Sequence, residues 1–310
     1  MVYERSAMMQ QLAVGQPLAA KYGNFGLTTN EVADPEFSLA MVVGEEGVGK
    51  TSLVRDCEGA LVNNFDLHSI PKPFPDAPEP LANFFPILKS DGCYYGPDAK
   101  GKETRIHKLT WEPFANQHKQ LIIAAEKDLP RPKMIVFDTV KPIIRLRKDY
   151  VITNNLCGVH ANFDALIDDG NAGQGWRFVY DALVDEWLEL RDAGYGVWLF
   201  AHIVQVTRKV KGDWQATTLE TRHNISDALY DKFSGLIEFK ATIELVPEAY
   251  KDEETGRAGF RKRRYLVNMA EHLSVKSRSR VCLPDRIELP AENAWSVFKA
   301  AYTAAASAAN

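Results

Sequence analysis

The segment Gly44–Thr51 reads G-E-E-G-V-G-K-T, the spacing of a phosphate-binding P-loop, G-x-x-x-x-G-K-[ST]. The glycines of such a loop let the backbone turn until several N–H groups point into one concavity that suits phosphate oxygens. We expect Lys50 to reach the β- and γ-phosphates of a nucleotide, and the hydroxyl of Thr51 to bind Mg²⁺. The residues expected around the phosphates are Gly44, Glu45, Glu46, Gly47, Val48, Gly49, Lys50, Thr51 and Ser52.

A second motif, Met134–Thr139, is an apolar run that ends in an acid, M-I-V-F-D-T. A continuous apolar run suits a parallel strand that is covered on both faces. Ligands of an open α/β sheet gather at the carboxyl ends of its strands, so we expect Asp138 beside Thr51, where it would hold Mg²⁺ through water. The simpler alternative is an aspartate that caps a strand end.

The residue after Asp138 is Thr139 and not a glutamate, so the second motif supplies no adjacent general base. In RecA-type enzymes the base comes from the end of a neighbouring strand. The second expected strand ends in F-D-L-H, which makes Asp66 the candidate base and Glu58 a weaker one. Asp66 could equally cap the turn before Pro71.

His202 directly follows the apolar run Val197–Ala201. At the carboxyl end of a core strand it could sense the γ-phosphate and pass that signal to the next loop. The alternative is an ordinary polar residue at a strand end.

The order of apolar segments along the chain indicates the elements that position these residues. Strand-like runs alternate with helical spacing, which predicts an α/β fold with a mostly parallel central sheet flanked by helices. The expected strands are 39–43, 60–67, 134–139 and 197–201, and the expected helices begin at Ser52 and cover 113–127 and 176–188.

Domain boundaries follow from changes in composition. Residues 1–37 have no strong periodicity and are expected to be an N-terminal extension, followed by a nucleotide-binding domain over 38–290. A long proline-rich insertion at about residues 70–105 is either a surface insertion or a partner-binding segment. Residues 291–310 are alanine-rich and predict a helix docked on the domain.

Basic residues concentrate in the C-terminal third. Residues 204–232 combine lysines and arginines with Trp214, and a predicted β-hairpin carries four consecutive basic residues, Arg261–Arg264. Cations that track phosphates and aromatic rings that stack on bases suit single-stranded DNA, although a solvated loop would have a similar composition. In an extended strand, Lys276 and Arg278 share one face and could reach the nucleotide of a neighbouring subunit, or could protect an exposed sheet edge.

Composition sets outer limits on function. The chain has 310 residues and a net charge of −4, so nucleic-acid binding would need a local basic patch. The four cysteines form no C-x-x-C pair, which argues against a zinc site and a disulfide framework. No signal pattern or membrane-length apolar run is present, so we expect a cytoplasmic protein with no membrane partner.

The order of these parts resembles phage-type RecA-like nucleotide-binding proteins, ATPases associated with recombination and single-strand annealing. The matching features are Gly44–Thr51, Met134–Thr139, a helix begun by tryptophan, Leu199–His202 and a Lys-x-Arg strand before Leu283. The resemblance implies that ATP and Mg²⁺ are the cofactors, that His202 is a sensor, and that Lys276 and Arg278 reach the nucleotide. It also implies a homo-oligomer, other phage recombination or replication proteins as partners, and the host cytoplasm if the chain is phage-encoded.

The first functional hypothesis is therefore an ATP-hydrolysing RecA-like protein that acts on DNA, with Lys50, Asp138, Asp66, His202, Lys276 and Arg278 as its catalytic residues. The second is a nucleotide-gated interaction protein with little turnover. A P-loop kinase remains open but leaves the C-terminal hairpin unexplained. A GTPase is disfavoured because the sequence has no Asn-Lys-x-Asp motif.

Overall fold

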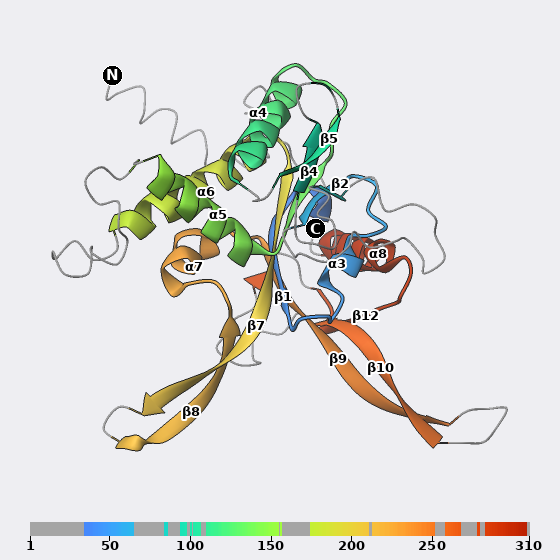
Figure 1. Ribbon diagram of the computed structural model, residues 1–310. Helices are drawn as coiled ribbons and strands as arrows, with labels where there is room; N and C mark the ends of the chain where they lie inside the picture. Colours follow the sequence, from blue (N-terminus) through green and yellow to red (C-terminus); the bar gives the residue numbers. More distant parts are fainter. Residues whose placement is uncertain are drawn as a thin grey trace, which may run out of the picture.

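The computed structural model describes residues 34–64, 84–85, 94–97, 100, 102–106, 110–154, 156, 174–210, 213–251, 258–267, 278–279 and 283–308. These parts form an α/β fold around a large twisted sheet (Figure 1). Among them, no helix is both long and apolar enough to cross a lipid bilayer.

The main sheet contains ten of the described strands, in the order β12-β10-β9-β1-β7-β6-β2-β3, with β8 paired to β7 and β11 to β9. The strands from β9 to β3 are parallel to their neighbours, and β8, β10, β11 and β12 pair antiparallel. The bounds are β1 Leu39–Gly44, β2 Ala60–Asn64, β3 Phe84–Phe85, β6 Met134–Asp138, β7 Gly196–Val210, β8 Asp213–His223, β9 Phe239–Lys251, β10 Ala258–Val267, β11 Arg278–Ser279 and β12 Arg286–Leu289. A separate antiparallel pair joins β4 Tyr94–Pro97 to β5 Glu103–Ile106.

Helices cover both faces of the sheet. One face carries α4 (Glu112–Glu126), α5 (Val140–Thr153), α6 (Gln174–Asp192) and α7 (Asp227–Ser234), and the other carries α3 (Lys50–Leu53) and α8 (Ala294–Ala308) (Figure 1). A short 3₁₀ turn, η2 (Pro35–Phe37), precedes β1. The expected alternation of strands and helices is confirmed, and with it the α/β P-loop class of fold.

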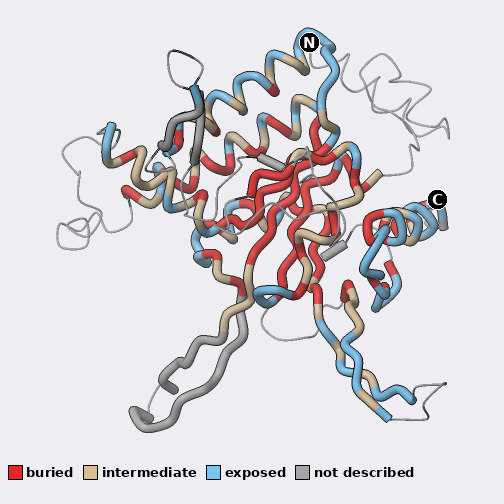
Figure 2. Tube along the Cα trace, turned by 45° about the vertical axis from the view of Figure 1, so that its right-hand side comes forward, coloured by how far each residue is buried: buried red, intermediate tan, exposed pale blue. Residues whose placement is uncertain are grey.

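The central strand β1 is buried along its whole length, and its side chains alternate between two cores. Leu39, Met41 and Val43 pack in the core beneath α4, α5, α6 and α7. Ala40 and Val42 pack in the core beneath α3 and α8. Figure 2 shows the buried strands as a continuous block through the middle of the molecule.

Two long hairpins extend from this block in the same direction, beyond the carboxyl ends of the parallel strands (Figures 1 and 2). The β7–β8 arm is the part of β7 beyond His202 together with β8, because from Ile203 onward β7 pairs only with β8. The β9–β10 arm is the part of β9 beyond Ile243 together with the facing part of β10. Both arms begin level with Gly44, the last residue of β1.

Several sequence expectations need correction. The helix after the P-loop is only Lys50–Leu53, followed by turns, so it is shorter than expected. His202 does not end its strand, because β7 continues to Val210, and the segment after it is an arm and a helix where a loop was considered. Helix α5 was not predicted, since its apolar residues are interrupted by Pro142 and four basic residues.

The C-terminal helix was predicted, and it packs tightly on the sheet. Phe298 is fully buried and its ring centroid lies 5.6 Å from that of Trp198 on β7 and 5.4 Å from that of Phe239 on β9. Lys299 on the same helix pairs with Asp34 and Glu36 of the segment before β1. Helix α8 is thus part of the same structural unit as the sheet.

Replacing Phe298 with alanine should lower the free energy of unfolding by about 3–5 kcal/mol, because it leaves a cavity among four aromatic rings. Val297, the preceding residue on α8, is 38% exposed and gives the matched control. Val297→Ala should change stability by less than about 1 kcal/mol. Chemical denaturation followed by tryptophan fluorescence measures both, and equal small losses would contradict the docked position of α8.

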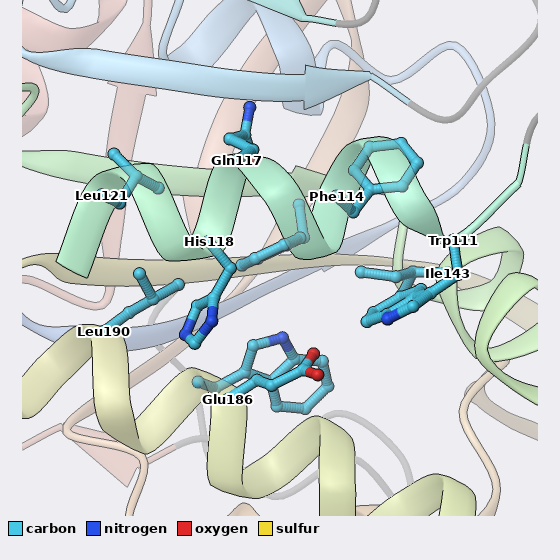
Figure 3. A pocket seen from close by; sticks show the side chains of 10 residues that line it. Trp111, Phe114, Gln117, His118, Leu121, Ile143, Glu186 and Leu190 are labelled. Carbon is cyan, nitrogen blue, oxygen red and sulfur yellow. The ribbon is translucent and has the colours of Figure 1, made fainter. Parts of the chain in front are cut away.

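A small cavity lies between α4, α5 and α6, on the opposite face from α8 (Figure 3). His118 of α4 and Glu186 of α6 point into the same space, and Glu186 lies 3.3 Å from Arg147 of α5. Burial raises the pKa of Glu186 to about 7; Arg147 opposes this shift, whereas Glu189 and Asp185 add to it. Burial lowers the pKa of His118.

Because the pKa of Glu186 is higher in the folded than in the unfolded protein, its contribution to stability is present at low pH and lost as pH rises through about 7. Glu186→Gln keeps this side chain neutral at every pH. The free energy of unfolding of the variant, relative to that of wild type, should therefore rise between pH 5 and pH 8, by an amount on the order of 3 kcal/mol at most, as chemical denaturation at each pH would measure. Comparing the two proteins removes the separate contribution of His118. Glu126→Gln, an exposed change on α4, should show no such trend, and a flat difference for Glu186→Gln would contradict the assignment.

Candidate nucleotide-binding site

The predicted P-loop connects β1 to α3 in the left-handed conformations that its glycines allow. Gly47 has φ 73° and Gly49 has φ 95°, a region that favours glycine. At Gly44 a Cβ atom would lie 2.7 Å from Val48 Cγ1 and 2.9 Å from the carbonyl oxygen of Ile243. The start of the loop therefore lies close against β9 at Ile243, and glycine is needed there.

Lys50 lies inside the curve of this loop and is only 5% exposed. Its Nζ donates to the carbonyl oxygens of Gly44 at 3.1 Å and Glu45 at 2.8 Å. Nζ also lies 3.1 Å from Nδ1 of His202. A neutral imidazole that carries its proton on Nε2 can accept this bond. The ammonium group is thus held where the P-loop motif requires a phosphate-binding cation.

Thr51 and Asp138 meet as expected, since Thr51 Oγ1 donates to Asp138 Oδ2. Asp138 is the last residue of β6 and is 2% exposed. The strand β6 is not adjacent to β1, because β7 lies between them and pairs with both. The contact therefore spans the width of one strand, and it is made at the carboxyl ends where parallel sheets place their ligands.

This pair of oxygens fits Mg²⁺. Hydroxyl and carboxylate oxygens are the hard ligands that Mg²⁺ prefers, and it usually completes its shell with water and substrate phosphates. No cluster of three or more His, Cys, Asp or Glu side chains that could hold a metal occurs in the described parts of the chain. Thr51 and Asp138 are thus suited to hold Mg²⁺ together with a bound phosphate chain.

His202 is fixed at the base of the β7–β8 arm. Its backbone N–H donates to Oδ1 of Asn224 at 3.1 Å, and its carbonyl oxygen accepts from the N–H of Asn224 at 2.8 Å. Asn224 follows directly after β8. His202 thus contacts the P-loop lysine through its side chain and, through its backbone, the residue at which β8 returns to the base of the arm. Sequence reasoning identified His202 but not Asn224.

The described end of β2 carries amides and no carboxylate. Asn64 is level with Asp138 in the strand pairing, and Asn63 is fully buried. Neither atom of the Asn63 amide group has a hydrogen-bond partner among the described residues. An amide cannot accept a proton as a general base. The predicted base, Asp66, lies two residues beyond Asn64 and outside the described residues.

The predicted finger residues are only partly described. Lys276 lies outside the described residues. Arg278 lies on β11, where its backbone pairs with that of Lys240 on β9. Its role at a neighbouring nucleotide stays a prediction.

The basic run Arg261–Arg264 does not form the uniform positive patch that the sequence suggested. Arg261 pairs with Glu248, and Arg263 pairs with both Glu248 and Glu288. Acids on the neighbouring strands β9 and β12 therefore neutralise part of the charge. Residue identity alone could not show this cross-strand pairing.

Arg264 of β10 was grouped with that patch, but its side chain contacts the P-loop. Its Nη1 lies 3.4 Å from the carbonyl oxygen of Gly49, and its Nη2 donates to the carbonyl oxygen of Pro290. A Cβ atom on Gly49 would lie 2.4 Å from Nη1. The only signal in the sequence was the position of a basic residue in the second strand of a predicted hairpin.

Four predicted residues thus meet at the carboxyl ends of the parallel strands, with the geometry for binding nucleotide phosphates: Lys50, Thr51, Asp138 and His202.

Comparison with known protein families agrees with this assignment. Residues 38–281 match the family model described as an AAA domain, and no curated protein matches the chain. The match covers most of the chain and supports a P-loop nucleotide-binding protein. On the P-loop geometry and this match together, the chain belongs to the AAA domain family of P-loop ATPases.

Proposed function

We propose that this protein hydrolyses ATP with Mg²⁺ and acts on single-stranded DNA in recombination, replication or repair, as RecA-like proteins do. The observation that carries the proposal is the shared position of the nucleotide site and the two arms. Both arms begin level with Gly44, so the residues around the phosphates are also the roots of the arms.

The proposed chemistry assigns a role to each residue of the site. Lys50 and the P-loop N–H groups hold the phosphates, and the buried setting strengthens their attraction for negative charge. Thr51 and Asp138 would hold Mg²⁺, which when bound neutralises charge on the phosphate oxygens. Asp66 is the proposed general base for the attacking water, and Lys276 and Arg278 are proposed to reach the nucleotide of a neighbouring copy in a homo-oligomer.

His202 is the proposed link between nucleotide and arm. A phosphate that draws Lys50 Nζ toward itself changes the partner of His202 Nδ1, now 3.1 Å from that nitrogen. The backbone of His202 is bonded to Asn224 on both its N–H and its carbonyl. A shift of His202 would therefore be felt at the closing end of the β7–β8 arm.

The β9–β10 arm offers the described surface best suited to a nucleic acid strand. Phe260 is 82% exposed and shares one face of the arm with the exposed Lys262, whereas the exposed Tyr250 lies on the other face. Arg261 lies over the ring of Tyr250. Exposed aromatic rings among cations suit base stacking and phosphate contacts.

The protein partners that we propose are phage recombination or replication proteins.

The second candidate is a nucleotide-gated interaction protein with little turnover. The amides of Asn63 and Asn64 at the described end of β2 favour it, because they provide no base there. In that case the arms would signal to a protein partner.

Lys50→Ala should remove ATP binding and hydrolysis, because it deletes the cation that the P-loop holds for the phosphates. Turnover of the purified protein with Mg²⁺ should rise when single-stranded DNA is added, and this stimulation should also be lost in the variant. The matched control is Lys119→Gln, an exposed lysine on α4 that should leave both rates unchanged. Tight ATP binding without turnover, indifferent to DNA, would support the interaction protein instead.

Replacing Phe260 with alanine and Arg261 and Lys262 with glutamine should weaken single-stranded DNA binding at least tenfold. The slope of log affinity against log salt concentration should also become less steep by about 1.4, because two cations are lost and each phosphate contact contributes about 0.7. Fluorescence anisotropy across a salt series measures both quantities. The double variant Lys119→Gln with Lys127→Gln removes the same charge near α4. An unchanged slope for the arm variant would place the DNA elsewhere.

A further inference from the structure

Arg264 occupies an unusual position for a residue of an exposed hairpin. Its backbone pairs with Leu245 on β9 and Leu289 on β12, at the base of the β9–β10 arm, where β10 still has a strand on each side. Its side chain leaves the hairpin and contacts the carbonyl of Gly49 in the P-loop. Among the described residues, this hydrogen bond connects β10 to the P-loop.

An open groove of about 740 Å³ lies at this contact. Its walls include Gly49 and Ser52 of the P-loop, Arg264, and the apolar residues Leu245, Leu289 and Pro290. The volume is within the range of small-molecule sites, which combine apolar walls with a few polar groups. The groove is also lined by Arg261, Lys262, Arg263 and Glu288, so it offers both apolar and charged groups directly beside the phosphate-binding loop.

The positions of the other site residues give a bound nucleotide a direction. Thr51 contacts Asp138 on β6, and Lys50 contacts His202 on β7, so the metal and the terminal phosphate belong on the β7 side of β1. The strands β9 and β10 lie on the other side of β1. A phosphate chain that starts near Asp138 and crosses the P-loop must leave it on the β10 side, at the groove.

The charge of Arg264 is balanced differently from that of its neighbour. Arg263 pairs with two glutamates, whereas the described partners of Arg264 are two backbone carbonyl oxygens. Its Nε is buried without a hydrogen-bond partner. Burial is also the main cause that lowers the pKa of Arg264, with Arg55 nearby adding to it. A half-buried cation held mainly by carbonyls is stabilised further by an anion.

We infer that Arg264 binds the diphosphate part of the nucleotide from within the same chain, and that the adjoining groove receives the nucleoside. The 3.4 Å contact to Gly49 is long for a hydrogen bond, so a phosphate oxygen can replace it with a shorter, charge-assisted one. This inference rests on the proposed nucleotide binding. It adds a phosphate-binding cation that is supplied in cis, separate from Lys276 and Arg278.

The test compares the affinities of ATP and ADP in wild type, Arg264→Gln and Arg264→Lys, by isothermal titration with Mg²⁺. A charge-assisted hydrogen bond to the diphosphate predicts that Arg264→Gln weakens ATP and ADP to the same degree, by about tenfold or more. Arg264→Lys should recover part of the loss. Arg286→Gln, an exposed arginine on the neighbouring strand β12, is the matched control and should bind both nucleotides as wild type does.

A second measurement separates phosphate binding from a purely structural bridge between Gly49 and Pro290. The rise in unfolding temperature on adding ADP should be smaller in Arg264→Gln than in wild type. A variant that unfolds at a lower temperature but shows the full rise with ADP would overturn the inference. The inference would also be overturned if Arg264→Gln bound ATP and ADP with wild-type affinity while Lys50→Ala lost binding. If wild type itself binds neither nucleotide, the proposed function fails first.

Discussion

The parallel pairing of β1 with β7 on one side and β9 on the other is the constraint on which the rest of the structure depends. Gly44 lies level with His202 and Ile243, so β1 turns into the P-loop just where its two neighbours continue outward. The close approach of Gly44 to the carbonyl of Ile243 leaves no space for a side chain. A shift of one residue in either pairing would turn the alternating core residues of β1 against the wrong neighbours.

The site also depends on how charge is distributed among buried groups. Lys50 donates to two carbonyl oxygens and contacts the imidazole of His202, and Arg264 contacts two carbonyl oxygens. Farther along β10, Arg261 and Arg263 pair instead with carboxylates, Glu248 of β9 and Glu288 of β12. The side chain of Arg264 is thus held by backbone carbonyl oxygens beside the P-loop, whereas Arg261 and Arg263 are held by carboxylates.

Local sequence was sufficient for much of the fold and for the centre of the site. The P-loop, the Asp138 strand and His202 each follow a short apolar run, and parallel strands bring such ends together whatever lies between them in the chain. The C-terminal hairpin and the helix α8 also had clear patterns. Helix α5 was missed because its buried residues Val140, Ile143 and Val151 are widely spaced among basic residues.

What the sequence could not provide were contacts between distant segments. Asn224 meets His202 only because β8 returns along β7, and Arg264 meets Gly49 across 215 residues. The run Arg261–Arg264 looks uniform in sequence, but adjacent strand residues point to opposite faces and meet different partners. Strand register, which is set by the whole sheet, decides which of these cations remain exposed.

The arms have a mechanical consequence that follows from their length. Beyond His202, β7 continues for eight residues to Val210, a lever of roughly 26 Å at the usual rise of a strand. A rotation of about 5° at its root would move its tip by roughly 2 Å over that length. His202, at the base of the arm, is bonded to Asn224 and in contact with Lys50, so a rotation there would be enlarged several-fold at the tip. Both arms begin beside the turn after β1, so each would amplify a small rotation at that point.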